Sequence, residues 1–243
     1  MIDVKVSFTP SQGVMRNQFV AQTGLAVTSW SDECIGKNIF YLYDNGVIDE
    51  KLLSIASLVI CSEALNDTPQ SKMLIVNDID YINDGSVISV NSSGKLRVLF
   101  NPKSTNNALF VTDACNNFCV MCPQPPKPII QDDAVEHLND VVSLIRKQDA
   151  PEVLGITGGE PTTIKAGLIN VLKNISEKFP DTIIQLLSNG RLFSYRDFAL
   201  EMGQASEKMF VCVPLFGATS DIHDYIVQSK GAFDRKRLIN PTF

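Results

Sequence analysis

Residues 109–126 read Leu-Phe-Val-Thr-Asp-Ala-Cys-Asn-Asn-Phe-Cys-Val-Met-Cys-Pro-Gln-Pro-Pro, and they hold three of the six cysteines of this 243-residue chain. Cys115, Cys119 and Cys122 follow a C-x3-C-x2-C spacing. Thiolates are soft ligands that suit iron–sulfur clusters, and three on one short loop can each bind a different iron of a four-iron, four-sulfur cluster. The fourth iron then keeps an open position, which the amino and carboxylate groups of a substrate can chelate.

Other interpretations of the cysteine loop, residues 115–122, compete with a cluster. Zinc usually takes a fourth Cys or His ligand, and the only histidines, His137 and His223, lie far along the chain. A disulfide is disfavoured by the odd number of thiols on the loop and by the lack of a secretory segment. A buried core is disfavoured because Asn116 and Asn117 stand between the thiols. The sequence therefore favours the cluster.

The composition is that of an acidic, globular chain. Hydrophobic residues make up 44% of it and the net charge is -6, so it can bury a core but lacks the basic face of a general nucleic-acid binder. No apolar run reaches the roughly 20 residues of a membrane span, and the first residues lack the basic and apolar regions of a signal peptide. We therefore expect a cytoplasmic protein with no nucleic-acid and no membrane partner. The remaining cysteines, expected to be small buried hydrophobes, are Cys34, Cys61 and Cys212.

Residues 1–105 are expected to form a small, mainly β domain. Short runs with strand character occur at Val4–Phe8, Asn38–Leu42 and Lys72–Val76. The apolar segment 50–62 fits either a buried helix or a helix that runs into a strand. Two alternating runs, 86–90 and 96–100, flank a loop that contains glycine and predict a β-hairpin. No catalytic pattern stands out here, so a substrate-presenting or partner-docking role is a hypothesis.

From about residue 106 the pattern changes to strands that alternate with helices, which predicts a parallel sheet. The expected strands are 108–112, 153–157, 182–187 and 209–215. The first helix begins near Asp132, the second has its apolar face between Leu168 and Ile175, and the third opens at Ser194–Asp197, which has capping-box spacing. The cysteine loop follows the first strand at its carboxyl end, where α/β barrels carry their chemistry.

Polar or glycine-rich turns follow the next strands. Gly158-Gly159-Glu160-Pro161 follows the second, where glycines allow close backbone approach and a carboxylate can pair with an ammonium. Such a turn is ordinary in isolation, but its position after the second strand favours a ligand site. Ser188-Asn189-Gly190 follows the third, and there a ligand contact and a plain strand-end turn are equally good interpretations. His223, within Ile222-His223-Asp224, is expected to cap or pack.

Together these motifs resemble the radical S-adenosylmethionine (SAM) superfamily. More narrowly, residues 115–126, 155–162 and 222–224 are similar to the maturase of the His-Xaa-Ser peptide-modification system, and the resemblance covers about residues 75–234. It implies that the three cysteines of the loop ligate a 4Fe-4S cluster whose open iron is chelated by SAM. The residues that it implies in SAM binding are Met121, Gly158, Gly159, Glu160, Pro161, Ser188, Asn189, Val213 and Leu215.

The resemblance also implies a role for each part of this set. The Gly-Gly-Glu-Pro segment is expected to hold the methionyl amino group of SAM, and Ser188 and Asn189 its ribose or carboxylate. The segment from Val213 to Leu215 is expected to face the adenosine. Met121 stands where the superfamily often has an aromatic residue against adenine, and a thioether can make a similar contact.

The family barrel usually has six strands, whereas only four strand–helix units are visible here. We therefore expect an α/β fold: an incomplete (β/α) partial TIM-type barrel at residues 106–243, truncated at the C-terminus and preceded by the β-rich domain at residues 1–105. A truncated product, a natural short form and one half of an assembly are all open explanations. An open parallel sheet edge after the fourth strand would need covering.

The function implied by the resemblance is that of a radical SAM enzyme, a maturase that uses a 5'-deoxyadenosyl radical to modify a ribosomally made peptide or small protein. Its expected partners are this substrate, an electron donor and a companion radical SAM protein. The alternative is a non-catalytic or incomplete iron–sulfur scaffold that partners a companion maturase, which the missing strands motivate. A plain α/β domain with an accidental cysteine cluster would require the cysteine spacing, the Gly-Gly-Glu-Pro motif and the strand order all to coincide.

Overall fold

The structure is a computed structural model, and it describes residues 19–23, 39–43, 50, 58–62, 65–66, 68, 73–75, 80–83, 85–90, 96–127 and 134–239. The chain divides into two compact units. Unit 1 comprises Met1–Thr105 and Ser143–Ala150, and unit 2 comprises Asn106–Val142 and Pro151–Phe243. Within the described residues, no helix is long and apolar enough to cross a membrane.

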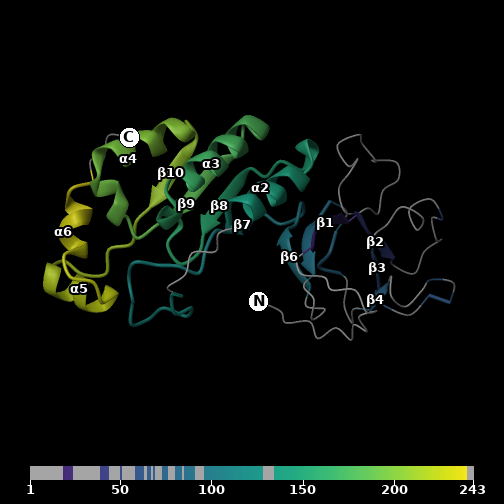
Figure 1. The fold of residues 1–243 in the computed structure, drawn as a ribbon, viewed down its shortest axis with the longest axis horizontal. Helices are drawn as coiled ribbons and strands as arrows, with labels where there is room; N and C mark the ends of the chain where they lie inside the picture. Colours follow the sequence, from purple (N-terminus) through teal and green to yellow (C-terminus); the bar gives the residue numbers. More distant parts are fainter. Residues whose placement is uncertain are drawn as a thin grey trace. The chain divides into compact units, whose positions relative to one another are not determined.

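Unit 1 contains a six-stranded sheet with the order β4-β3-β2-β1-β5-β6 (Figure 1). Its strands are β1 Phe19–Thr23, β2 Ile39–Tyr43, β3 Leu58–Cys61, β4 Met73–Ile75, β5 Val87–Val90 and β6 Leu96–Phe100. Neighbours among the first four strands are parallel, whereas β5 and β6 form the predicted antiparallel pair. The apolar segment 50–62 ends in a strand, and β1 was not predicted. The strand predicted at 4–8 lies outside the described residues.

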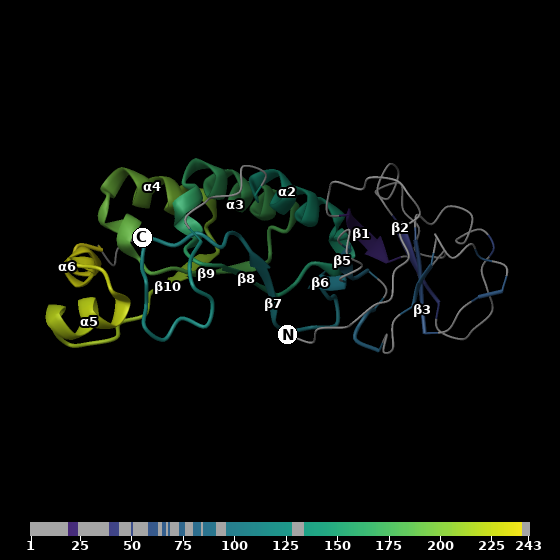
Figure 2. The ribbon, with the colours of Figure 1, turned by 60° about the horizontal axis from the view of Figure 1, so that its bottom comes forward.

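Unit 2 contains a four-stranded parallel sheet with the order β10-β9-β8-β7. Its strands are β7 Asn107–Phe110, β8 Val153–Thr157, β9 Ile183–Leu187 and β10 Met209–Cys212. The helices between them are α2 Ala134–Leu144, α3 Ala166–Lys178 and α4 Arg196–Ala205, and Figure 2 shows all three on the same face of the sheet. This α/β architecture of four strand–helix units confirms the predicted fold class.

The hydrophobic core of unit 2 lies between the sheet and these helices. Strands β8 and β9 each bury every second residue, as a strand covered on one face does. The fully buried side chains of this layer include Leu154, Ile156, Ile184 and Leu186 from the sheet and Leu168, Val171, Leu172 and Ile175 from α3. The apolar stripe predicted on the second helix therefore faces the core, and α3 ends two residues before Pro180.

The opposite face of this sheet carries exposed apolar side chains. Phe110, Ile183, Leu187 and Phe210 are all exposed. The strand registers place them on one face. Phe210 pairs with Gln185, which lies on the same face as Ile183 and Leu187 in β9, and Phe110 pairs with Thr157, which shares that face with Gly155, the partner of Gln185. Strand β10 ends the sheet on one side, so the edge after the fourth strand is unpaired within the described residues.

Two local predictions were wrong. The fourth strand was expected to reach residue 215, but β10 ends at Cys212, and beyond it Pro214 has no N–H to donate to a ladder. The predicted capping box at Ser194–Asp197 does not form. Ser194 belongs to the short 3-10 helix η6, Arg191–Ser194, and its hydroxyl donates to the carbonyl oxygen of Arg191, so Tyr195 takes the N-cap position of α4 without a side-chain cap.

Two short helices, α5 Ser220–Val227 and α6 Ala232–Arg237, complete unit 2. Asp224 holds them together, since its carboxylate accepts hydrogen bonds from the N–H groups of Gly231 at 2.5 Å and Phe233 at 2.9 Å. These are the first N–H groups of α6, which otherwise have no partner inside the helix. Asp224 therefore fixes the position of α6 relative to α5.

Candidate functional site

The carboxyl ends of the four strands of unit 2 carry the segments that the sequence singled out. Residues 111–127 follow β7, residues 158–165 follow β8, residues 188–195 follow β9, and residues 213–219 follow β10. All four strands run in the same direction, so these segments emerge at one end of the sheet. The candidate site is therefore built from four loops on one support.

The cysteine loop is held against α5 by backbone hydrogen bonds. The N–H groups of Phe118 and Val120 donate to the carbonyl oxygens of Val227 and Ile226, each at 3.0 Å. These carbonyls belong to the last turn of α5, where helical carbonyl groups have no partner inside the helix. The N–H groups of the loop therefore bond to the carbonyl groups of the helix end, and the thiols lie on a backbone that these bonds hold in place.

The surroundings of the Cys115 and Cys119 thiols favour their protonated form. Cys115 and Cys119 are half-buried, and Cys122 is exposed. Burial raises the pKa of the Cys115 thiol, an effect that the N–H of Asn117 opposes and the charges of Glu160 and Cys119 reinforce. Burial, followed by the neighbouring Cys122, also raises the pKa of Cys119. Binding of a metal or cluster would therefore release protons from this loop.

The cysteine loop offers three thiols, which as thiolates are the ligand type of iron–sulfur clusters. Within the described residues, no three His, Cys, Asp or Glu side chains are placed to hold one metal ion. A four-iron cluster needs a wider set, because each thiolate binds a different iron. In addition, Asn117 Nδ2 and Arg191 Nε are buried at this loop without an acceptor in the described part of the chain. Thiolate and cluster sulfurs are acceptors of such hydrogen bonds.

Gly158 and Gly159 bring the backbone after β8 against the backbone that leads into the cysteine loop. The N–H of Gly159 donates to the Thr112 carbonyl at 2.6 Å, and the N–H of Glu160 donates to the Ala114 carbonyl at 2.8 Å. A Cβ on Gly158, which has a φ of +151°, would lie 2.7 Å from the Thr112 oxygen. A Cβ on Gly159 would overlap the Ala114 oxygen. Both glycines are therefore required by close approach of two backbones.

Replacing Gly159 with alanine is expected to lower the free energy of unfolding by about 2–3 kcal/mol, because backbone atoms occupy the space of the new methyl group. Gly203 in α4 is a matched control: an added Cβ meets nothing within 4 Å there, and alanine should stabilise the helix by about 0.5–1 kcal/mol. Urea denaturation followed by circular dichroism measures both changes. Wild-type stability of the Gly159→Ala protein would contradict the close approach.

Glu160 is fully buried, and its carboxylate accepts hydrogen bonds from two loops. Its Oε1 accepts from the Thr162 N–H at 3.1 Å, the Thr162 hydroxyl at 2.5 Å and the Ser188 hydroxyl at 2.7 Å. Its Oε2 accepts from the N–H of Asn189 at 2.6 Å. Pro161 is buried beside it and begins the short 3-10 helix η5, Pro161–Ile164. The structure thus joins Glu160, Ser188 and Asn189 in one network.

Asn189 and Arg191 connect the loop after β9 to the cysteine loop. Asn189 Nδ2 donates to Asn116 Oδ1 at 2.7 Å and lies 4.0 Å from Cys115 Sγ. Arg191 Nη1 donates to the Asn116 carbonyl oxygen and, at 3.1 Å, to Asn117 Oδ1. Sequence reasoning missed Arg191. The signals for it were the two asparagines between the thiols and its place directly after the Ser-Asn-Gly turn.

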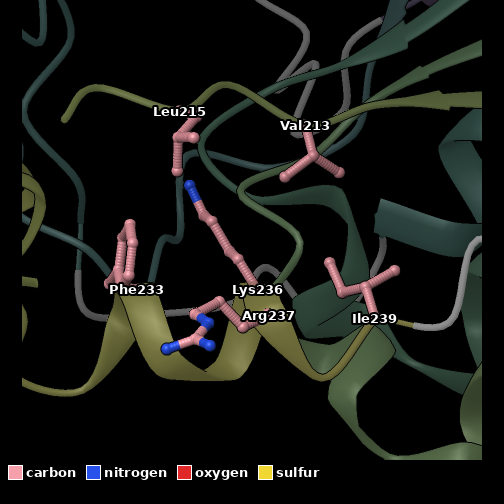
Figure 3. Close-up of a pocket in the computed structure, with 6 residues that line it drawn as sticks. All are labelled: Val213, Leu215, Phe233, Lys236, Arg237 and Ile239. Carbon is pink, nitrogen blue, oxygen red and sulfur yellow. The ribbon is translucent and has the colours of Figure 1, made fainter. Parts of the chain in front are cut away.

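A pocket of about 290 Å³ lies between the segment after β10 and α6 (Figure 3). It is lined by Val213, Leu215, Phe233, Lys236, Arg237 and Ile239. The pocket therefore includes both residues that were predicted to face an adenosine. Figure 3 shows the Lys236 side chain extending from α6 toward Leu215. Met121, which is 48% exposed, is not among the lining residues.

Lys236 lies in this pocket and interacts electrostatically with Cys119 of the cysteine loop. Its ammonium donates to the Pro214 carbonyl at 2.5 Å and lies 5.8 Å from the centre of the Phe216 ring. Burial lowers the pKa of Lys236, while the charges of Cys119 and Glu160 raise it. Sequence reasoning missed this residue, for which the basic run at 235–237 was the signal.

His223 packs, as the sequence predicted, and it is fully buried. Its ring stacks on Phe216 with 6.0 Å between centroids and lies 5.9 Å from the ring of Phe233. Its Nδ1 accepts from the N–H of Phe216 at 3.1 Å. Burial lowers the pKa of His223 from its ordinary 6.5, Lys236 lowers it further, and Asp224 raises it. The folded chain therefore holds this ring neutral.

The protein is expected to lose stability as the pH falls below about 6.5, because the unfolded chain then binds a proton that folded His223 excludes. The loss ends once the pH reaches the lowered pKa of the folded form. His223→Gln keeps an acceptor for the Phe216 N–H but does not titrate, so its unfolding free energy should vary less between about pH 7.5 and 5.5. Urea denaturation at several pH values tests this, and parallel curves for the two proteins would refute it.

Comparison with known proteins finds a family whose model matches this chain. The model described as the radical SAM superfamily matches residues 109–238, more than half of the chain. No curated protein matches the chain. Among solved structures, the chain is similar to one described as "Native anSMEcpe with bound AdoMet and Cp18Cys peptide", with 20% sequence identity and a TM-score of 0.38. That match covers 54% of this chain, and this chain spans 38% of the length of the other.

Proposed function

Because this chain belongs to the radical SAM superfamily, whose members use an iron–sulfur cluster and SAM, we propose that it is a radical SAM enzyme that modifies a peptide. In this proposal Cys115, Cys119 and Cys122 hold a 4Fe-4S cluster, and SAM binds beside them. The observation that carries the proposal is the joining of three loops by direct hydrogen bonds: Asn189 contacts both Glu160 and the cysteine loop.

The protein's own part is to bind, orient and shield the reacting groups. Among the described residues Glu160 Oε2 accepts one hydrogen bond, and a carboxylate oxygen accepts about two, so it has capacity left for the ammonium of SAM. Ser188 and Asn189 fix the orientation of that carboxylate. Val213 and Leu215 offer apolar contact to the adenosine. When bound, the reduced cluster supplies an electron that splits a carbon–sulfur bond of SAM into methionine and a 5'-deoxyadenosyl radical, which abstracts a substrate hydrogen atom.

The proposed substrate is a ribosomally made peptide or small protein of the His-Xaa-Ser type. It rests on the resemblance of residues 115–126, 155–162 and 222–224 to the maturase of that system. The reaction also needs a low-potential electron donor, and a companion radical SAM protein is a further proposed partner. A cytoplasmic location belongs to the same proposal.

Anaerobic reconstitution with iron and sulfide tests the proposal. We expect about four irons per chain, an electron paramagnetic resonance signal that changes on addition of SAM, and 5'-deoxyadenosine that forms only with both SAM and dithionite. Peptides with and without the His-Xaa-Ser pattern then test the substrate by a mass change. The proposed site would be refuted if the chain bound no cluster, or if the resonance signal of its cluster did not change on addition of SAM.

The second candidate function is a non-catalytic iron–sulfur scaffold that partners a companion maturase. The observation that favours it is the exposed apolar face formed by Phe110, Ile183, Leu187 and Phe210, next to the unpaired edge of β10. A cluster that binds SAM but yields no 5'-deoxyadenosine until a companion radical SAM protein is added would favour the scaffold. Turnover by the isolated chain would exclude it.

A further inference from the structure

Arg191 lies where the loop after β9 meets the cysteine loop. It follows Gly190, whose φ of +80° places it in the left-handed region and where a Cβ would come within 2.6 Å of Val213. Glycine is therefore needed there. The turn directs Arg191 across to the cysteine loop, where Nη1 donates to the Asn116 carbonyl and to Asn117 Oδ1. One guanidinium thus holds two consecutive residues between the first and second cysteines.

Two N–H donors at this contact have no acceptor in the described residues. Arg191 Nε and Asn117 Nδ2 are buried, and neither has an acceptor in the described part of the chain. A buried N–H without an acceptor costs about 1–3 kcal/mol, so a ligand that supplied acceptors here would be favoured. Once Cys115 is ionised, its charge and that of Arg191 attract each other. A ligand held by the ionised cysteine loop would therefore meet both unused donors and a positive charge.

We propose that Arg191 is a positioning residue that holds the cysteine loop in place and raises the reduction potential of the cluster. This inference rests on the function proposed above. Reduction adds one negative charge to the cluster, and a nearby fixed positive charge favours the reduced form. Hydrogen bonds donated to cluster or thiolate sulfurs act in the same direction. Arg191 combines the charge with the donors: Nη1 bonds to both asparagines, and Nε is a second, separate N–H without an acceptor in the described residues, which a lysine ammonium lacks.

Three variants separate these effects. Arg191→Met removes the charge and the hydrogen bonds but keeps much of the side-chain volume. Arg191→Lys keeps the charge and loses the separate Nε donor. Lys208→Met is the matched control for net charge: Lys208 is exposed, pairs with Asp181 at 2.8 Å, and stands just before β10, at the other end of the sheet from the cysteine loop.

The first measurement needs no cluster. Hydrogen exchange of the metal-free proteins reports the loop amides of Phe118 and Val120, which donate to α5. Loss of a charged hydrogen bond should speed their exchange about tenfold or more in Arg191→Met, with a smaller effect in Arg191→Lys and none in Lys208→Met. Unchanged exchange in Arg191→Met would overturn the positioning role.

The second measurement is a dithionite titration of the reconstituted proteins, followed by electron paramagnetic resonance. The midpoint potential is expected to be more negative in Arg191→Met than in the wild type, close to the wild type in Arg191→Lys, and unchanged in Lys208→Met. A wild-type midpoint in Arg191→Met would overturn the effect on potential, as would a change confined to the response of the signal to SAM. If the wild type itself takes up no cluster, the proposed function fails, and the exchange result still decides the positioning role.

Discussion

Replacing Cys119 with alanine is expected to abolish stable cluster binding and to reduce 5'-deoxyadenosine formation at least about 100-fold, since even outer partners of metal ligands often cost 10–100-fold. In the proposed cluster the three thiolates bind three different irons, so none can take over the position of another. The change removes only the sulfur: the flanking N–H groups of Phe118 and Val120 keep their acceptors in α5. The loss would therefore report the ligand and not the fold of the loop.

Cys212 provides the matched control for this prediction. It is a half-buried cysteine of β10 whose sulfur accepts from Gln185 Nε2 at 3.4 Å, in the same unit but outside the cysteine loop. Cys212→Ala should keep the iron content and the turnover of the wild type. Iron and sulfide are quantified in the reconstituted proteins, and the nucleoside product is measured by chromatography. Wild-type turnover in Cys119→Ala would refute the cluster assignment.

The sheet of unit 2 could be predicted because its signals are local. Residues 153–157 were predicted as a strand and are β8, and the stripe from Leu168 to Ile175 was predicted as the inner face of a helix and is buried in α3. In each case the hydrophobic period within one segment carries the information. The hairpin at 86–100 was predicted for the same reason, since two alternating runs and the loop between them are adjacent in the chain.

The errors arose where a contact that the sequence pattern does not show decides the structure. Residues 213–215 continue an apolar run, yet the ladder stops at Cys212, and the N–H of Phe216 donates to His223 instead of to a strand. Ser194 has the right spacing for a cap, but its hydroxyl already serves the turn of η6. Strand β1 pairs with β2 and β5, partners that no local pattern reveals.

The site was predictable as separate motifs but not as a network. Spacing marked the three cysteines, and the position after the second predicted strand marked the Gly-Gly-Glu-Pro segment. The contact of Glu160 with Ser188 joins residues that are 28 apart, and that of Arg191 with Asn117 joins residues that are 74 apart. Such pairs depend on the order of strands in the sheet, because β8 and β9 are neighbours and deliver their loops side by side. Lys236 lies on α6, which Asp224 holds against α5, so its place depends on residues outside its own segment.

The contacts of Ser188 and Asn189 differ from those that the resemblance implied. The resemblance implied that they contact SAM directly, whereas in the structure the Ser188 hydroxyl and the Asn189 N–H donate to Glu160. A ligand contact is still compatible with them, since the Asn189 side chain turns to the cysteine loop. Their shown contribution, however, is to hold a buried carboxylate in one orientation.

Replacing Glu160 with alanine is expected to lower the free energy of unfolding by about 3–5 kcal/mol, even in the absence of any cofactor. The substitution leaves the N–H groups of Thr162 and Asn189 and two hydroxyls buried without their acceptor, and each such group costs about 1–3 kcal/mol. The hydroxyls can rotate to other partners, but the two backbone N–H groups have fixed directions. The expected loss is therefore smaller than the sum over four groups.

Glu160→Gln separates the charge from the shape. A glutamine has one oxygen to accept with, whereas the N–H groups of Thr162 and Asn189 approach different carboxylate oxygens. Either orientation of the amide leaves one of these donors facing an NH₂ group, so we expect a loss of about 1–3 kcal/mol. The exposed Glu177 of α3 is the matched control, and Glu177→Ala should stay within about 0.5 kcal/mol of the wild type. Urea denaturation of the metal-free proteins ranks the three variants. A Glu160→Gln protein as stable as the wild type would mean that Glu160 does not accept from both loops, and the link between the segments after β8 and β9 would then have to rest on other contacts.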